Sequence, residues 1–211
     1  MGPAAVGAPV RRSRNWSATG AAAIRSAPGV VRVAVEFRVL GAVEVRVDGN
    51  RLDLGPARQQ RVLAALLLDA NQAVTADQLI DRVWGERAPQ RARLTLYSYL
   101  SRLRQALRTA AGETQIVRRS GGYELTVDPS AVDLHRFRSL AARARTAMGA
   151  GDEDEAARLF EQALAFWRGD ACRGMETPWF DAQRETVHLE WITTVLDRGT
   201  SSYAAVCTPN C

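Results

Sequence analysis

Apolar and polar residues alternate along residues 36–54, a pattern typical of short strands with one buried face. Segments 37–40 and 43–47 follow the period of two most closely. Asp48-Gly49 is a hairpin turn signal, and a short third strand over 51–54 fits after it. The pattern predicts a small antiparallel sheet where the ordered chain begins.

The hydrophobic spacing then changes to that of helices. Apolar residues recur every three or four positions over 56–69, 75–84 and 89–108, which predicts three helices. Thr75 and Gln78 have the spacing of a capping box at the start of the second helix. The front of the chain is therefore predicted as a sheet followed by three helices.

A β-hairpin is predicted directly after the third helix. Its strands are residues 115–119 and 123–127, and Ser120-Gly121-Gly122 forms a flexible tip between them. Residues 36–127 thus have the element order of an α+β winged helix-turn-helix: an N-terminal β-sheet, three helices and a C-terminal wing hairpin. We expect this domain to span 36–128.

Helical spacing returns after Asp128-Pro129-Ser130, which is predicted as a linker. Asp133 is expected to cap one helix, Asp152 begins another, and a third is predicted over 178–198. Periodicity is lost after Gly199. The rear of the chain is thus predicted as an all-α domain over 129–198, with an irregular tail over 199–211.

Charge is divided unevenly along the chain, which contains no lysine. Residues 1–128 carry 19 Arg against 11 Asp and Glu, a net charge of 19 − 11 = +8, whereas residues 129–211 carry 9 against 12, a net charge of −3. A basic front half suits a polyanion and an acidic rear half suits a protein partner. Residues 1–35 contain no acid and many Ala, Gly and Pro residues, and are expected to be a disordered basic leader.

Several classes of protein are disfavoured by the residues present. No apolar run approaches the roughly 20 residues needed to span a bilayer. Cys172, Cys207 and Cys211 are expected to be free thiols of a cytosolic protein. With only His135 and His188 as histidines, and no phosphate-binding glycine loop, no catalytic set, metal site or cofactor site can be assembled. We therefore expect that the protein is not an enzyme.

The third predicted helix has two contrasting faces. Leu96, Leu100, Leu103 and Leu107 lie within about 60° of one another on a helical wheel and form a core stripe. Residues 90–111 contain no acid, so the other face can approach phosphates and base edges without repulsion. A solvated basic face is the alternative. The polar candidates in this segment are Arg91, Arg93, Thr95, Ser98, Ser101, Arg102 and Gln105.

The hairpin supplies a second candidate contact. Arg118 and Arg119 lie just before its tip, where an arginine can reach a phosphate or enter a narrow minor groove. Two arginines beside a turn are often solvated surface residues with no binding role. A helix-turn-helix followed directly by a basic hairpin is more specific, because the two elements can contact neighbouring grooves of one duplex.

Two motifs stand out at the end of the third predicted helix and around the hairpin tip: Leu100-Ser101-Arg102-Leu103-Arg104-Gln105-Ala106-Leu107 and Arg119-Ser120-Gly121-Gly122-Tyr123. Through them residues 36–127 resemble the output domain of OmpR/PhoB-type response regulators. Five further motifs are spread over both halves of the chain: Phe37-Arg38-Val39-Leu40-Gly41, Leu66-Leu67-Leu68-Asp69-Ala70-Asn71, Leu79-Ile80-Asp81-Arg82-Val83-Trp84-Gly85, Val132-Asp133-Leu134-His135-Arg136-Phe137 and Ala163-Leu164-Ala165-Phe166-Trp167-Arg168-Gly169. Through these the chain is more similar still to the Streptomyces antibiotic regulatory protein (SARP) family, whose second half is a tetratricopeptide-like bacterial transcriptional activation domain.

The resemblance implies a cytoplasmic transcription activator that binds direct repeats of double-stranded DNA in promoters of secondary-metabolite gene clusters. It further implies recruitment of RNA polymerase and a possible side-by-side dimer on DNA. Matching positions imply that Thr95, Ser98, Arg102 and Gln105 contact DNA from the helix, and Arg119 from the wing.

The sequence departs from the family in three ways. Ser120 and Gly121 replace the prolines usual at the wing tip, no receiver domain precedes the winged helix, and the later helices of the activation domain are missing. The activation domain is thus expected to be partial, in a truncated family member. Two alternatives stay open: a repressor or non-activating DNA-binding member, and a protein-interaction adaptor whose basic half is incidental.

Overall fold

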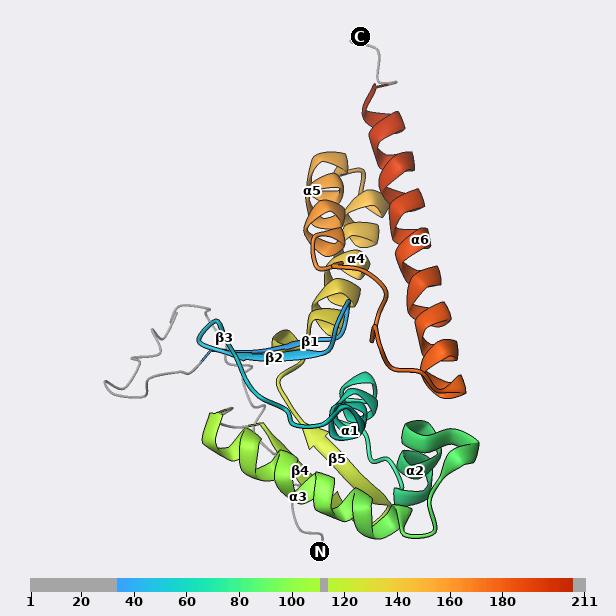
Figure 1. The fold of residues 1–211 in the computed structure, drawn as a ribbon. Coiled ribbons are helices and arrows are strands. Elements are labelled where there is room, and N and C mark those ends of the chain that lie inside the picture. Colours follow the sequence, from blue (N-terminus) through green and yellow to red (C-terminus); the bar gives the residue numbers. More distant parts are fainter. Residues whose placement is uncertain (1–33, 111–113, 207–211) are drawn as a thin grey trace, which may run out of the picture. The chain divides into compact units, whose positions relative to one another are not determined.

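The computed structural model describes residues 34–110 and 114–206, which belong to one compact unit. The predicted leader over 1–35 thus lies outside the described residues except for its end, where Val35 begins the first strand (Figure 1). The elements are β1 (Val35–Arg38), β2 (Glu44–Val47), β3 (Asn50–Arg51), α1 (Ala57–Leu68), α2 (Ala76–Trp84), η1 (Gly85–Arg87), α3 (Ala92–Ala110), β4 (Gln115–Arg119), β5 (Gly122–Thr126), η2 (Pro129–Ala131), α4 (Asp133–Gly149), α5 (Glu153–Leu164) and α6 (Pro178–Val206).

The fold confirms the predicted order of a sheet, three helices and a hairpin, followed by helices alone. Strands β1, β2 and β3 form an antiparallel sheet in which Phe37 lies opposite Val45. Strand β3 is shorter than predicted and ends at Arg51. Strands β4 and β5 pair from Gln115 opposite Thr126 to Arg119 opposite Gly122.

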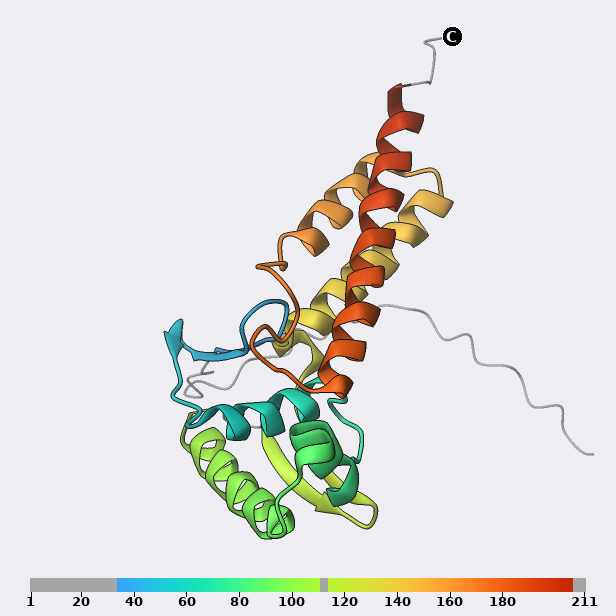
Figure 2. The same ribbon diagram turned by 45° about the vertical axis from the view of Figure 1, so that its right-hand side comes forward.

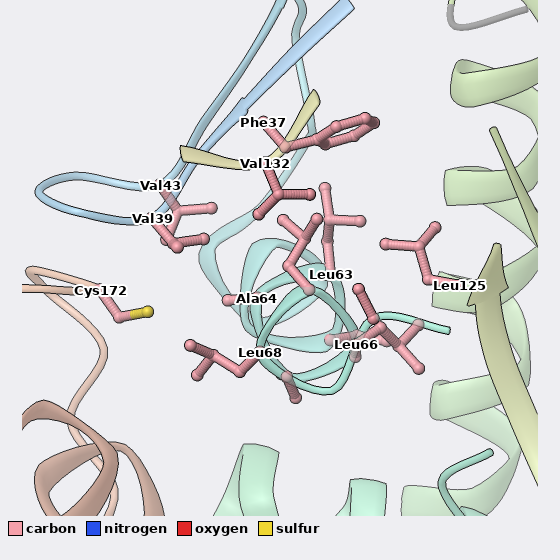
Figure 3. Packing of buried hydrophobic residues seen from close by; sticks show 14 of the residues in the cluster. Phe37, Val39, Val43, Leu63, Ala64, Leu66, Leu68, Leu125, Val132 and Cys172 are labelled. Atoms are coloured by element: carbon pink, nitrogen blue, oxygen red, sulfur yellow. The ribbon is translucent and has the colours of Figure 1, made fainter. Parts of the chain in front are cut away.

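Helix α1 lies at the centre of the core. All seven residues from Val62 to Leu68 are buried, although the periodicity singles out only one face. A helix that is apolar all round needs neighbours on several sides. Figure 3 shows those neighbours: Phe37 from β1, Val43 from the connection between β1 and β2, Leu125 from β5, and Cys172 from the segment before α6.

Helix α2 begins with the predicted capping box. The backbone N–H of Gln78 donates to Thr75 Oγ1 at 3.1 Å, and the backbone N–H of Thr75 donates to Gln78 Oε1 at 2.9 Å. Both bonds satisfy amide groups that a helix start leaves without partners. The cap fixes where α2 begins, just after Val74, which hydrogen-bonds through its backbone to Tyr123 of the hairpin.

The rear half is a bundle of three helices, with α6 running alongside α4 and α5 in both views (Figures 1 and 2). Phe160 of α5 is fully buried in a cluster with Ala144 of α4, and Asp152 caps α5 by accepting from the backbone N–H of Glu155. Helix α6 corrects one prediction, because it passes through Gly199 to Val206 where an irregular tail was expected. One glycine costs only about 1 kcal/mol relative to alanine inside a helix, so it does not by itself end one.

Asp133 corrects a second prediction. It is not the cap of α4 but its first residue, and its buried carboxylate accepts hydrogen bonds from the backbone N–H groups of Val39 at 2.8 Å and Leu40 at 3.1 Å. Arg168 donates to the same carboxylate at 2.7 Å. A residue of the rear half thus satisfies backbone groups at the end of β1.

The two halves share one hydrophobic core. Phe180 and Val187 of α6 belong to the same buried cluster as Leu66 of α1. Cys172, a free thiol in this cluster, has its pKa raised to about 12 by burial. Cys207 and Cys211 lie outside the described residues. The packing is therefore continuous across residue 128. The domain boundary at that residue stays a prediction.

Candidate nucleic-acid interface

Helix α3 presents the two faces that its sequence predicts. The side chains of Leu96, Leu100, Leu103 and Leu107 have no exposed surface, and they anchor α3 against the core. The residues predicted on the other face are exposed except Thr95, which is half-buried. They are Arg91, Thr95, Ser98, Ser101, Arg102 and Gln105.

The arginines of this face differ in their partners. Neither Arg91 nor Arg102 forms an ion pair with any residue among 34–110 and 114–206. Arg93 instead lies toward α2, where its guanidinium is paired with the Asp77 carboxylate. The sequence could not indicate this pairing, because Asp77 lies 16 residues earlier and on another helix.

Arg104 joins the hairpin to α3. Its Nε donates to the carbonyl oxygen of Ile116 at 2.7 Å, and its guanidinium lies 5.5 Å from the centre of the Tyr123 ring. The Tyr97 ring contacts Tyr123 at 6.2 Å between centres. Sequence reasoning missed this role of Arg104, because one of its partners is a backbone atom. The hairpin is thus held against the side of α3.

The two hairpin arginines lie on opposite faces of the ribbon. Arg118 is directly opposite Tyr123 in the strand register, so it shares the face that turns toward α3. Arg119 shares the other face with Glu124, and its Nε donates to the Glu124 carboxylate at 2.9 Å. Both arginines are exposed, but within the described chain only Arg119 has a carboxylate partner.

The Arg119–Glu124 pair also fixes the protonation of the carboxyl group. The pKa of Glu124 lies below its usual range, first because Arg119 donates to it and further because Thr126 does so at 3.1 Å. Glu124 is therefore a carboxylate at neutral pH, and it offsets the charge of Arg119 on this face of the hairpin.

The tip of the hairpin requires glycine. Gly122 has φ +150°, and a Cβ at this position would lie 2.1 Å from the carbonyl oxygen of Val74. This close approach lets β5 pair with the segment before α2. Gly121 has open space around its Cβ position. The contact places the hairpin tip beside the start of α2.

No group of three His, Cys, Asp or Glu residues within 34–110 and 114–206 is arranged to hold a metal ion. None of the helices described there is both long and apolar enough to cross a bilayer. The exposed residues of α3 and the adjoining hairpin, described above, form the candidate site, and we call this surface the α3–hairpin face.

Two families match consecutive parts of the chain. Residues 49–135 match the family described as transcriptional regulatory protein, C terminal, and residues 132–205 match the bacterial transcriptional activator domain. The first match contains α1 to β5, and the second contains α4 to α6 except for the last residue of α6.

Individual relatives align over much of the chain. The chain is 39% identical over 158 residues to the regulatory protein AfsR of Streptomyces griseus, covering 75% of this chain and 16% of AfsR. It is 39% identical over 139 residues to the transcriptional regulatory protein MoaR1 of Mycobacterium tuberculosis, covering 64% of this chain and 45% of MoaR1. The chain thus spans less than half the length of either relative.

A solved structure agrees with this arrangement of elements. EmbR of Mycobacterium tuberculosis, solved in complex with a low-affinity phosphopeptide, superimposes with a TM-score of 0.78 at 26% sequence identity. The superposition covers 82% of this chain and 46% of EmbR. The winged helix and the helical bundle that follows it therefore occur together in a known protein.

Proposed function

The chain belongs to the Streptomyces antibiotic regulatory protein family of transcription regulators, and on that premise we propose that its front half, residues 36–128, binds specific sequences of double-stranded DNA. In this proposal α3 enters the major groove and the β4–β5 hairpin contacts the adjoining backbone or minor groove. Helix-turn-helix proteins dock in this way, with residues near the start of the recognition helix facing base edges.

One observation carries the proposal: the exposed face of α3 contains arginines and short polar side chains with no acid among them. Arg91 and Arg102 are free of carboxylate partners within the described chain, so each can exchange water for a phosphate or a guanine edge. Ser98 and Ser101 are small enough to let the helix approach the floor of the groove. The leucines behind this face hold the helix rigid.

The hairpin supports the same docking. Because Arg104 and Tyr97 fix Tyr123 against α3, the two elements form one surface. Arg118, on the side that turns toward α3, is placed for a phosphate of the same groove. We propose that Arg119 contacts DNA only after exchanging Glu124 for a phosphate oxygen.

We propose further that the protein acts as an activator. In this proposal it binds direct repeats in promoters of a secondary-metabolite gene cluster, two copies can bind side by side, and residues 129–198 contact RNA polymerase. The activity would take place in the cytoplasm, where bacterial DNA lies. The acidic helical half and the family premise support this role.

The proposal is tested by selecting duplexes from a random pool with the purified chain and footprinting the recovered sequence upstream of neighbouring genes. We expect a defined motif protected as two repeats on one face of the helix. A promoter reporter then separates the roles, since an activator raises transcription and a repressor lowers it. Recovery of no common sequence would contradict sequence-specific binding.

A further inference from the structure

Exposed large apolar side chains are unevenly distributed in the described residues. In the part of the chain from β1 to β5 there are two, Leu94 and Tyr97, and both lie in the first two turns of α3. Leu94 is 64% exposed, and Tyr97 is 38% exposed. The surface proposed to meet DNA is thus also where this half of the protein exposes its large apolar groups.

Tyr97 has a structural explanation, because its ring packs against Tyr123. Leu94 has no such ring contact. It is the third residue of α3 and points away from the leucine stripe, one turn after Arg91 and one turn before Ser98. Position along the helix matters here, since residues at the start of a recognition helix are those that reach base edges.

The groups beside Leu94 make this turn less polar than its sequence suggests. Thr95 Oγ1 donates to the carbonyl oxygen of Arg91 at 3.1 Å, and Ser98 Oγ donates to that of Leu94 at 3.2 Å. Their hydroxyl protons are therefore turned to the helix backbone. The outward surface of this turn combines the Leu94 side chain with the cationic end of Arg91.

The major groove offers one apolar feature that matches this surface: the C5 methyl group of thymine. We propose that Leu94 is a specificity-determining residue that packs against a thymine methyl in the bound site, while Arg91 contacts the backbone beside it. The inference rests on the proposed function and identifies one base that the site contains. The absence of acids from 90–111 favours DNA over a protein as the partner of this surface.

The test removes each partner of the contact in turn: the thymine methyl group from the DNA and the Leu94 side chain from the protein. In the selected duplex, each thymine is replaced in turn by uracil, which pairs identically but lacks the C5 methyl, and affinity is measured for the unmodified chain and for Leu94→Ala. We expect one or two uracil substitutions to weaken binding by the unmodified chain about fourfold, the effect of one buried methyl-sized group. The same uracils should cause no loss for Leu94→Ala.

Leu189→Ala is the matched control, because Leu189 is 63% exposed but lies on α6. It should keep the full response to uracil. Indifference of the unmodified chain to every uracil, or an undiminished response in Leu94→Ala, would overturn this inference while leaving DNA binding intact. Failure to bind any duplex would overturn the proposed function and this inference with it.

Discussion

The arginines of the α3–hairpin face fall into three groups at the scale of single residues. Arg104 is structural, since it hydrogen-bonds Ile116 and contacts the Tyr123 ring. Arg93 and Arg119 are paired with carboxylates. Arg91, Arg102 and Arg118 have no such partner in the described chain, so their charges remain available to a polyanion. These groups predict different effects of removing each arginine.

Arg102→Ala should weaken specific DNA binding by about 1–3 kcal/mol, because an arginine that contacts a guanine edge contributes that much to discrimination. Fluorescence anisotropy on the selected duplex measures the loss. Arg143→Ala is the control, since Arg143 is exposed on α4 and forms no ion pair with any other described residue. Equal affinities for Arg102→Ala and the unmodified chain would place Arg102 outside the interface.

Glu124→Gln should strengthen DNA binding and steepen its salt dependence. The substitution removes a negative charge from the hairpin and releases Arg119 from its ion pair. If Arg119 then neutralises one phosphate, the slope of log K against log[salt] becomes more negative by about 0.9.

Asp154→Asn makes the same change of charge on the exposed start of α5, far along the chain from the hairpin. It should leave the slope unchanged. A slope for Glu124→Gln equal to that of Asp154→Asn would show that Arg119 does not face a phosphate.

At the scale of elements, the hairpin depends on the close approach of its tip to the segment before α2. Gly122→Ala would force a Cβ to within 2.1 Å of the Val74 carbonyl oxygen and hold alanine at φ +150°. Strain of this kind costs about 1–3 kcal/mol or more. We expect Gly122→Ala to lower the free energy of unfolding measured in urea. Gly121→Ala is the control, because a Cβ at that position meets nothing within 4 Å, and its free energy of unfolding should stay close to that of the unmodified chain. Equal stability of the two variants would mean that the tip can move freely.

The elements were predictable where local pattern decides them. The leucine stripe of α3, the Thr75 capping box and the hairpin all depend on spacing within a few residues, and all three are confirmed. The course of α6 past Gly199 was not predictable in this way, since glycine is compatible with both a helix and its end.

What the sequence could not reveal are contacts between distant segments. Asp133 lies 94 residues from Val39, and nothing in either local pattern indicates that one carboxylate binds the end of β1. The exposed position of Leu94 is of another kind. Helical spacing alone places this residue opposite the leucine stripe, so its exposure could have been predicted from the local pattern.

At the scale of the whole molecule, the winged helix and the helical bundle are physically coupled. Thr177 Oγ1 donates to the carbonyl oxygen of Arg82 at 2.8 Å, and the Arg82 guanidinium lies 4.4 Å from the centre of the Trp179 ring. Together with the Asp133 contacts, these interactions connect α2 and β1 to the helices of the rear half.

Asp133→Ala should destabilise both halves together. It leaves the backbone N–H groups of Val39 and Leu40 buried without partners, at a cost of about 2–6 kcal/mol for the two. Urea unfolding followed by far-UV circular dichroism and by tryptophan fluorescence should give coincident transitions at lower urea. Asp154→Ala serves as the control. Two separated transitions in the unmodified chain would contradict a shared core.

The central claim is that the α3–hairpin face binds duplex DNA through its unpaired arginines. The measurement that tests it most directly is the affinity of the purified chain for its selected duplex across a series of salt concentrations. We predict a linear fall of log K with log[salt] whose slope corresponds to several neutralised phosphates, at about −0.9 each, and whose magnitude decreases by about that amount in Arg118→Ala. A slope near zero, or no binding at low salt, would contradict the account.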